Sequence, residues 1–304
     1  MVDVCNYSLT YSLTGCTNHM SPDDHYQNLK RVIAAIGGKA RRINVIMPFL
    51  YESRQHKRSS RESLDCALAL QELVRMGADN IITFDAHDPR VQNAIPLSGF
   101  ETVRPTYQFV KGLLRTHKDL KIDSGHMMAI SPDEGATERA VYLANVLNLD
   151  MGMFYKRRDY TKIIDGRNPI VAHEFLGSSV EGKDVIILDD MISSGDSILD
   201  VAQQLKNRRA KRIFAAATFG LFTNGLDKFD KAYENGLIDG ILTSNLIYQT
   251  PELLERPYYI NCDMSKYIAL LIDTLNHDGS ISSILNPSER IVDIVERYNR
   301  GEEV

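Results

Sequence analysis

The sequence predicts an α/β protein in which largely parallel sheets are covered by helices on both faces. Short apolar runs alternate along the chain with longer segments whose apolar residues recur at helical spacing. The clearest run, residues 183–190 (KDVIILDD), is apolar through its middle without alternation, which is typical of a strand buried on both faces of a sheet. The composition, 43% hydrophobic and 25% charged over 304 residues, allows a full core and two domains.

The elements are predicted in order from these patterns. The first 28 residues are polar and weakly periodic, with turn signals at Gly15 and residues 21–24. Residues 63–76 have leucines and alanines near helical spacing, and Gly77 ends the helix that they predict. The predicted strands are residues 44–50, 80–85, 126–131, 151–155, 183–190, 212–218, 240–243 and 257–261. The predicted helices are residues 63–76, 107–117, 136–147, 198–208 and 266–275. We place the division between two similar halves after residue 147, which gives domains of residues 1–147 and 148–304.

Charge and cysteine usage exclude several classes of function. The formal net charge of −5 gives no general electrostatic reason to bind nucleic acid or anionic membranes. No apolar run approaches the length of a membrane span, and the N-terminus lacks a charged segment followed by an apolar one. The four cysteines are scattered without a CxxC spacing, which favours free thiols over a zinc site or a disulfide framework. We therefore expect a cytoplasmic protein without nucleic-acid or membrane partners.

The most informative segment is residues 185–197, VIILDDMISSGDS. An apolar strand ends in two carboxylates, and a short loop with hydroxyl groups and a glycine opens directly into a helix. The amides and the positive dipole end of a helix N-terminus suit a phosphate dianion, and serine hydroxyls can add donors. Carboxylates are acceptors for sugar hydroxyls or, through water, for a metal ion. The segment therefore predicts a sugar-phosphate site.

A plain strand–turn–helix junction, in which a serine or aspartate caps the helix, is the alternative. It accounts for the SGDS residues alone. It does not account for two successive carboxylates at the end of a buried strand, because their desolvation is costly without partners. The ligand site is therefore favoured.

This segment resembles the phosphoribosyl-binding motif of phosphoribosyltransferases and ribose-phosphate pyrophosphokinases. The resemblance implies two related phosphoribosyltransferase-like halves, each a mostly parallel sheet flanked by helices. It implies that Asp189 and Asp190 hold the ribose hydroxyls. It places the 5-phosphate on the loop formed by Ser193, Ser194, Gly195, Asp196 and Ser197. Two departures concern the phosphorylated substrate: the pyrophosphokinases usually have a third aspartate at the position of Ser193 and a glycine or small residue at that of Asp196.

Further segments resemble the pyrophosphokinases in particular. Residues 45–56 (VIMPFLYESRQH) resemble a segment whose Arg-Gln pair contacts ATP, which implies that role for Arg54 and Gln55. Residues 83–87 (TFDAH) resemble the strand end whose histidine meets the magnesium–ATP complex, here His87. Residues 131–136 (SPDEGA) resemble a loop whose aspartate, here Asp133, touches ribose hydroxyls and the metal. Without the resemblance, a solvated basic loop would be the better interpretation of residues 54–61, and a structural histidine that of His87.

Residues 155–158 (YKRR) fall where the family has a mobile loop with a catalytic lysine and arginine, which implies these roles for Lys156 and Arg158. Two cations that close over a transferring diphosphoryl group would stabilise its charge and help to exclude water. Residues 217–222 and 244–249 resemble two later family segments, with Phe219 in place of a histidine. The ordered resemblance runs from about residue 40 to 290, and this order is more specific than any single motif.

The resemblance implies diphosphoryl transfer from ATP to ribose 5-phosphate with Mg²⁺ as cofactor, in a homo-oligomer. It also leads us to expect that the family's N-terminal strands and adenine-binding loop are missing here. Three alternatives stay open: the same transfer to another ribosyl-phosphate acceptor, a phosphoribosyltransferase that consumes phosphoribosyl pyrophosphate, and a non-catalytic nucleotide-binding or regulatory homologue. The Arg54, Gln55 and His87 motifs count against the second of these.

Overall fold

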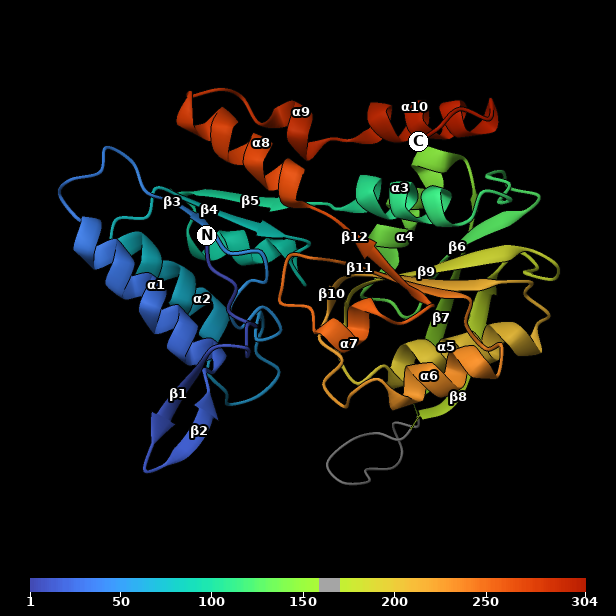
Figure 1. Ribbon diagram of the computed structural model, residues 1–304, viewed down its shortest axis with the longest axis horizontal. Helices are drawn as coiled ribbons and strands as arrows, with labels where there is room; N and C mark the ends of the chain where they lie inside the picture. The colour runs from blue at the N-terminus through green and yellow to red at the C-terminus, as the bar shows by residue number, and fades with distance from the viewer. Residues whose placement is uncertain (159–169) are drawn as a thin grey trace. The chain divides into compact units, whose positions relative to one another are not determined.

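The computed structural model describes residues 1–158 and 170–304 (Figure 1). The chain forms two compact units. The first comprises residues 1–105, 244–250 and 264–285, and the second comprises residues 106–243, 251–263 and 286–304. The division falls after residue 105 rather than after residue 147, because the helices over residues 106–116 and 137–147 pack on the sheet of the second unit.

The first unit is built on a short parallel sheet of β3 (Asn44–Ile46), β4 (Asn80–Phe84) and β5 (Gly99–Val103), in that order. Figure 1 shows α1 (Pro22–Ile36) and α2 (Asp65–Arg75) on one side of this sheet and α8 (Ser265–Asn276) on the other. The remaining elements are the hairpin of β1 (Thr10–Leu13) and β2 (Cys16–His19), the 3₁₀ helix η1 (Pro89–Ala94) and α9 (Ser282–Leu285).

Helix α1 begins where the sequence indicates only a turn. Ser21 is its N-cap and accepts a hydrogen bond from the Asp24 amide, while the Asp24 carboxylate accepts from the Ser21 amide. Pro22 takes the first helical position, where its missing N–H costs nothing. The Ser-Pro-Asp-Asp run is therefore a capping box, and the helix after it buries Tyr26 and Ile33 against the core of this unit.

The second unit contains a seven-stranded sheet in the order β12-β11-β10-β9-β6-β7-β8. Pairs β11–β10, β10–β9, β9–β6 and β6–β7 are parallel, and β8 joins the edge antiparallel to β7. The strands are β6 (Met127–Ser131), β7 (Asp150–Arg158), β8 (Ile170–Gly177), β9 (Asp184–Ile192), β10 (Ile213–Gly220), β11 (Gly240–Ser244) and β12 (Tyr259–Cys262). The helices are α3 (Thr106–Thr116), α4 (Thr137–Leu147), α5 (Asp196–Asn207), α6 (Asp227–Glu234), α7 (Pro251–Leu254) and α10 (Ser288–Asn299).

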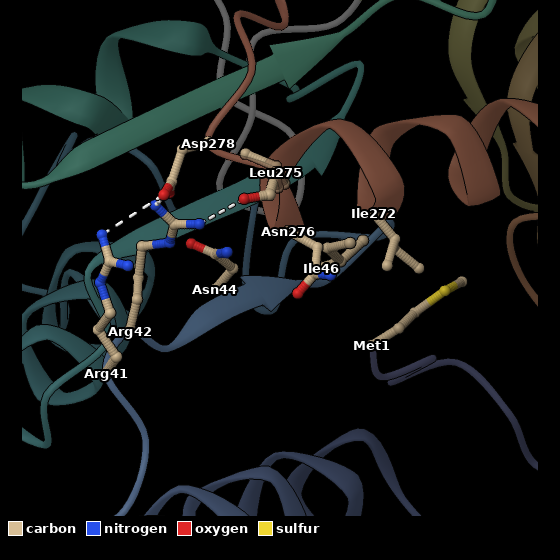
Figure 2. A pocket seen from close by; sticks show the side chains of 9 residues that line it. All are labelled: Met1, Arg41, Arg42, Asn44, Ile46, Ile272, Leu275, Asn276 and Asp278. Atoms are coloured by element: carbon tan, nitrogen blue, oxygen red, sulfur yellow. Dashed lines mark hydrogen bonds and ion pairs between the residues drawn. The ribbon is translucent and has the colours of Figure 1, made fainter.

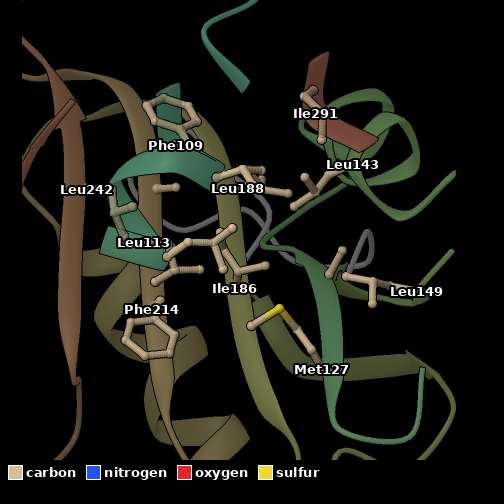
Figure 3. Packing of buried hydrophobic residues seen from close by; sticks show 14 of the residues in the cluster. Phe109, Leu113, Met127, Leu143, Leu149, Ile186, Leu188, Phe214, Leu242 and Ile291 are labelled. Carbon is tan, nitrogen blue, oxygen red and sulfur yellow. The ribbon is translucent and has the colours of Figure 1, made fainter. Parts of the chain in front are cut away.

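Successive residues of the central strands pack into opposite cores, as the alternation of a strand requires. Ile186 and Leu188 of β9 lie in the core beneath α3, α4 and α10, part of which is shown in Figure 3. Val185 and Ile187 lie in the core beneath α5 and α6. Both faces of the sheet are thus covered, and the expected α/β class with mostly parallel sheets is confirmed. Among the described residues, no helix is both long enough and apolar enough to cross a lipid bilayer.

Candidate functional site

The acidic pair lies at the carboxyl end of the central strand β9, but it does not end that strand. Pairing with β10 continues to Ile192, two residues beyond Asp190. Asp190 is buried with 3% of its surface exposed, and Asp189 is half-buried. The Asp190 amide donates to the Asp189 carboxylate at 2.8 Å. The pair thus occupies the place where parallel α/β sheets bind their ligands.

The environment of Asp189 disfavours its charged form. Burial raises the pKa of its carboxyl group well above the usual value, and the charges of Asp190 and Asp133 raise it further. Asp133 follows β6, the strand beside β9. The fold therefore gathers three of the predicted carboxylates at one edge of the sheet, where hydroxyl donors or a cation would relieve their repulsion.

Asp133 has a fixed orientation in its loop. The amides of Gly135 and Ala136 donate to one of its carboxylate oxygens at 2.9 and 3.2 Å. The hydroxyl of Ser131 donates to its carbonyl oxygen at 2.6 Å. These bonds form a local turn before α4, and they leave the side chain half-buried beside the acidic pair. Within the described residues, no three His, Cys, Asp or Glu side chains lie close enough to hold a metal ion by themselves.

The loop from β9 to α5 has the geometry of an anion site. Gly195 is the N-cap of α5 with a φ of +82°, a conformation that suits glycine. The first amides of a helix have no acceptor within the helix. The Asp196 amide donates to the Ser194 hydroxyl oxygen over a long 3.5 Å, and the Ser197 amide can donate to an anion. The Ser194 hydroxyl donates to the Asp196 carboxylate at 2.8 Å. Asp196 therefore accepts a hydrogen bond from a hydroxyl group that could otherwise donate to a phosphate.

The loop that follows β10 packs against the loop between β9 and α5. The amides of Leu221 and Thr223, which follow β10, donate to the carbonyls of Ile192 and Ser193 at 2.9 and 3.1 Å. At the start of α6, Lys228 forms an ion pair with Asp196 at 2.5 Å. These contacts were missed in the sequence, where nothing local connects α6 with the loop before α5.

Lys156 and Arg158 lie on β7, and their side chains are outside the described residues. The register pairs Ser131, the last residue of β6, with Met153 of β7. The backbone of both predicted catalytic residues therefore continues past the carboxyl end of β6, the strand end that carries Asp133. Beyond this point β7 pairs with β8 among the residues that the structure describes, with Lys156 opposite His173.

The predicted ATP-binding residues all lie in the first unit. Arg54 is exposed, and the Gln55 side chain donates to the Ser63 carbonyl at 2.9 Å. His87 follows β4 and is half-buried, with its ring 5.2 Å from that of His56. The segment that carries Arg54 and Gln55 therefore contacts the end of β4 through His56.

Two further residues, which were not predicted, lie at this contact. The His56 ring nitrogen Nε2 lies 3.5 Å from the Asp88 carboxylate. Hydrogen bonds from Arg90, with a smaller contribution from His56, lower the Asp88 pKa to about 2, while burial lowers the pKa of His56. Each residue directly follows a predicted one in the sequence, and that adjacency is the signal that could have identified them.

A cavity of about 570 Å³ in the first unit contains none of the predicted residues. As Figure 2 shows, Arg42 reaches across it to Asp278 and to the carbonyl of Leu275 at the end of α8. A cation at the carboxyl end of a helix stabilises its unpaired carbonyls. The arginine is therefore accounted for by helix capping. The cavity is lined by Met1, Arg41, Arg42, Asn44, Ile46, Ile272, Leu275, Asn276 and Asp278.

Two family models match the chain. The phosphoribosyl transferase domain matches residues 105–238, and the N-terminal domain of ribose phosphate pyrophosphokinase matches residues 10–77. The first match contains both the acidic pair and the loop before α5. The second match is to the family's N-terminal domain, so the expectation that the N-terminal strands are missing here is not supported.

Curated relatives and a solved structure agree with these matches. A ribose-phosphate pyrophosphokinase of Mycoplasma genitalium is 31% identical over 70% of this chain and 60% of the relative. One of Vibrio parahaemolyticus is 28% identical over 85% of this chain and 79% of the relative. The chain thus spans less than two thirds of the first relative and about four fifths of the second. The crystal structure of phosphoribosylpyrophosphate synthetase from Mycobacterium smegmatis shares the fold, with a TM-score of 0.72, 21% identity and coverage of 89% of this chain and 90% of the other.

Proposed function

Because the chain belongs to the ribose-phosphate pyrophosphokinase family, we propose that it transfers the diphosphoryl group of ATP to ribose 5-phosphate. The products are 5-phosphoribosyl 1-pyrophosphate and AMP. The observation that carries this proposal is the site on β9 and α5, where Asp189 and Asp190 precede a helix N-terminus by a few residues. The carboxylates would accept hydrogen bonds from the ribose hydroxyls, and the helix amides would donate to the 5-phosphate. The two groups follow each other along the chain in the same order as the hydroxyls and the phosphate in the substrate.

The proposed reaction is a direct displacement. The anomeric hydroxyl oxygen forms a bond to the β-phosphorus of ATP, the bond from that phosphorus to the α,β-bridging oxygen breaks, and AMP leaves with that oxygen. The hydroxyl proton passes to solvent. No covalent enzyme intermediate is needed, so positioning and electrostatic stabilisation supply the catalysis. Lys156 and Arg158 are proposed to stabilise the charge on the transferred group, and Arg54 and Gln55 to hold ATP.

The donors present fit Mg²⁺. This ion prefers oxygen ligands and is often held by one or two carboxylates together with substrate phosphates, which agrees with the small carboxylate set around Asp133. We propose that Asp133 and His87 lie beside the metal, as the resemblance implies. When bound, Mg²⁺ would offset the charge of the polyphosphate.

The test is AMP formation from ATP, Mg²⁺ and ribose 5-phosphate. We expect turnover that requires the sugar phosphate and falls at least a hundredfold in Lys156→Ala and Asp190→Asn, because each change removes a group that positions or stabilises the transition state. Lys211→Ala and Asp293→Asn, at exposed positions, serve as matched controls. Turnover that survives both site changes would refute the assignment of these residues.

A second candidate is the same transfer to another ribosyl-phosphate acceptor. Ser193 and Asp196 favour it, because they replace a carboxylate and a small residue within the substrate loop. An acceptor screen with a fixed concentration of ATP separates the two candidates. Ribose 5-phosphate that binds without turnover, when every other acceptor also fails, would indicate a non-catalytic nucleotide-binding or regulatory homologue.

The proposed assembly is a homo-oligomer of the cytoplasm with small-molecule substrates. Light scattering of the purified chain tests the assembly, and a single monomeric species at micromolar concentration would contradict it. The scattered free thiols agree with a reducing compartment.

A further inference from the structure

Asp196 places a carboxylate in the loop proposed to hold a phosphate. It is the first residue of α5 and follows the turn at Gly195. A carboxylate near a bound dianion would repel it. The family resemblance gives this position a glycine or small residue, so the chain needs a feature of its own that makes the loop compatible with its proposed ligand.

Both oxygens of this carboxylate are already bound. Lys228 donates to one oxygen at 2.5 Å, and the Ser194 hydroxyl donates to the other at 2.8 Å. These two hydrogen bonds, led by that from Lys228, lower the Asp196 pKa. The carboxylate therefore stays ionised and directed toward α6.

The backbone of Lys228 is fixed by the burial of the residue after it. Phe229 is fully buried and lies directly against Gly195, where a β-carbon would come within 2.2 Å of its ring. Phe222 packs edge-on against Phe229, with ring centroids 5.1 Å apart. The start of α6 is therefore fixed against the loop between β9 and α5, and Lys228 extends from a backbone that is held by packing.

We infer that Lys228 is a positioning residue for the phosphate group, which acts by holding and neutralising Asp196. This inference rests on the proposed function, because it takes the phosphate of ribose 5-phosphate as the ligand of the loop. With the ion pair formed, the side chains of Lys228 and Asp196 add no net charge to the loop, and the helix amides face the dianion. Without Lys228, the free carboxylate opposes binding.

A double-mutant cycle tests the inference, with the dissociation constant of ribose 5-phosphate measured by calorimetry. Lys228→Met should weaken binding about tenfold, the order expected for one uncompensated charge near a dianion in a solvated loop, and higher salt should reduce the loss. Asp196→Asn should bind at least as tightly as the wild type. The double variant Asp196→Asn/Lys228→Met should regain most of the lost affinity, because the charge that Lys228 offsets is gone.

Lys231→Met, at an exposed position on the same helix, is the matched control and should bind as the wild type does. Thermal denaturation checks that all variants fold. In the AMP assay, the loss in Lys228→Met should appear in KM for ribose 5-phosphate and leave kcat unchanged. A direct contribution to the transition state would instead lower kcat.

Two outcomes would overturn the inference while leaving the proposed function intact. One is Lys228→Met binding as tightly as the wild type. The other is an equal loss in the Asp196→Asn background, which would mean that the lysine contacts the phosphate itself. Conversely, the four affinities of the double-mutant cycle can follow the expected pattern in a chain that forms no AMP. That result would overturn the proposed reaction and support the inference. A wild-type chain that binds neither ribose 5-phosphate nor inorganic phosphate would overturn both.

Discussion

In Gly195→Ala, the new β-carbon would lie 2.2 Å from Cζ of Phe229 while the backbone keeps a φ of +82°. The left-handed conformation costs an alanine about 1–2 kcal/mol. Forcing a methyl group against a fully buried ring adds about 1–3 kcal/mol, as overpacked cores show. We therefore expect the free energy of unfolding to fall by about 2–5 kcal/mol.

Gly182→Ala is the matched control. Gly182 has a φ of +72°, and a β-carbon there would meet no atom within 4 Å. It should lose only the conformational part, about 1–2 kcal/mol. Urea denaturation of both variants, followed by circular dichroism, gives the difference in the free energy of unfolding. A Phe229→Leu background should reduce the cost of Gly195→Ala. Equal losses in the two glycine variants would show that Phe229 does not press on the loop.

The remaining predictions concern charge and reactivity. Because the Asp189 pKa is raised in the folded state, the fold binds this proton more tightly than the unfolded chain does, so its contribution to stability is full at acid pH and is lost as pH rises through the folded pKa. Asp189→Asn should therefore raise Tm at pH 7 and have less effect near pH 4; a lower Tm at pH 7 would contradict this. Arg212→Met should lower the free energy of unfolding by about 3–5 kcal/mol in urea denaturation, because the paired Asp184 carboxylate, 2.7 Å from the guanidinium and only 4% exposed, would lose its partner. A loss below about 1 kcal/mol would refute this. Asp184→Asn in the same background should recover part of the loss. Cys16 is exposed, whereas burial raises the pKa of Cys66 to about 12, so a thiol reagent at pH 8 should modify Cys16 rapidly and Cys66 only on unfolding; equal rates in the folded chain would contradict the burial.

The parts of the fold that follow from local pattern were predictable. Strand β9 was clear because its middle is apolar on both faces, and the helix N-terminus after it followed from the glycine. Strand β5 was missed because four of its five residues are only partly buried, which leaves no strong alternation. Helix α1 was missed because its capping box has the composition of a turn.

The candidate site was also only partly predictable from the sequence. Asp133, Asp189 and Asp190 were predictable as neighbours, because the carboxyl ends of adjacent parallel strands share one edge of the sheet. The ion pair of Lys228 with Asp196 was not, since it joins residues 32 positions apart whose packing is decided by the whole sheet. The division after residue 105 was likewise beyond local periodicity, which does not show which sheet a helix will cover.

The interleaving of the two units has a consequence for synthesis. The chain returns to the first unit with residues 264–285, and Tyr267 of α8 then packs edge-on against Phe84, which is fully buried. The second unit in turn needs α10, whose Ile291 lies in its core. Neither unit is complete before α8 and α10 have left the ribosome. For most of translation, the first hundred residues therefore expose the apolar face that α8 later covers. Transiently exposed surface of this kind promotes association, so the first unit is open to association until α8 has been synthesised.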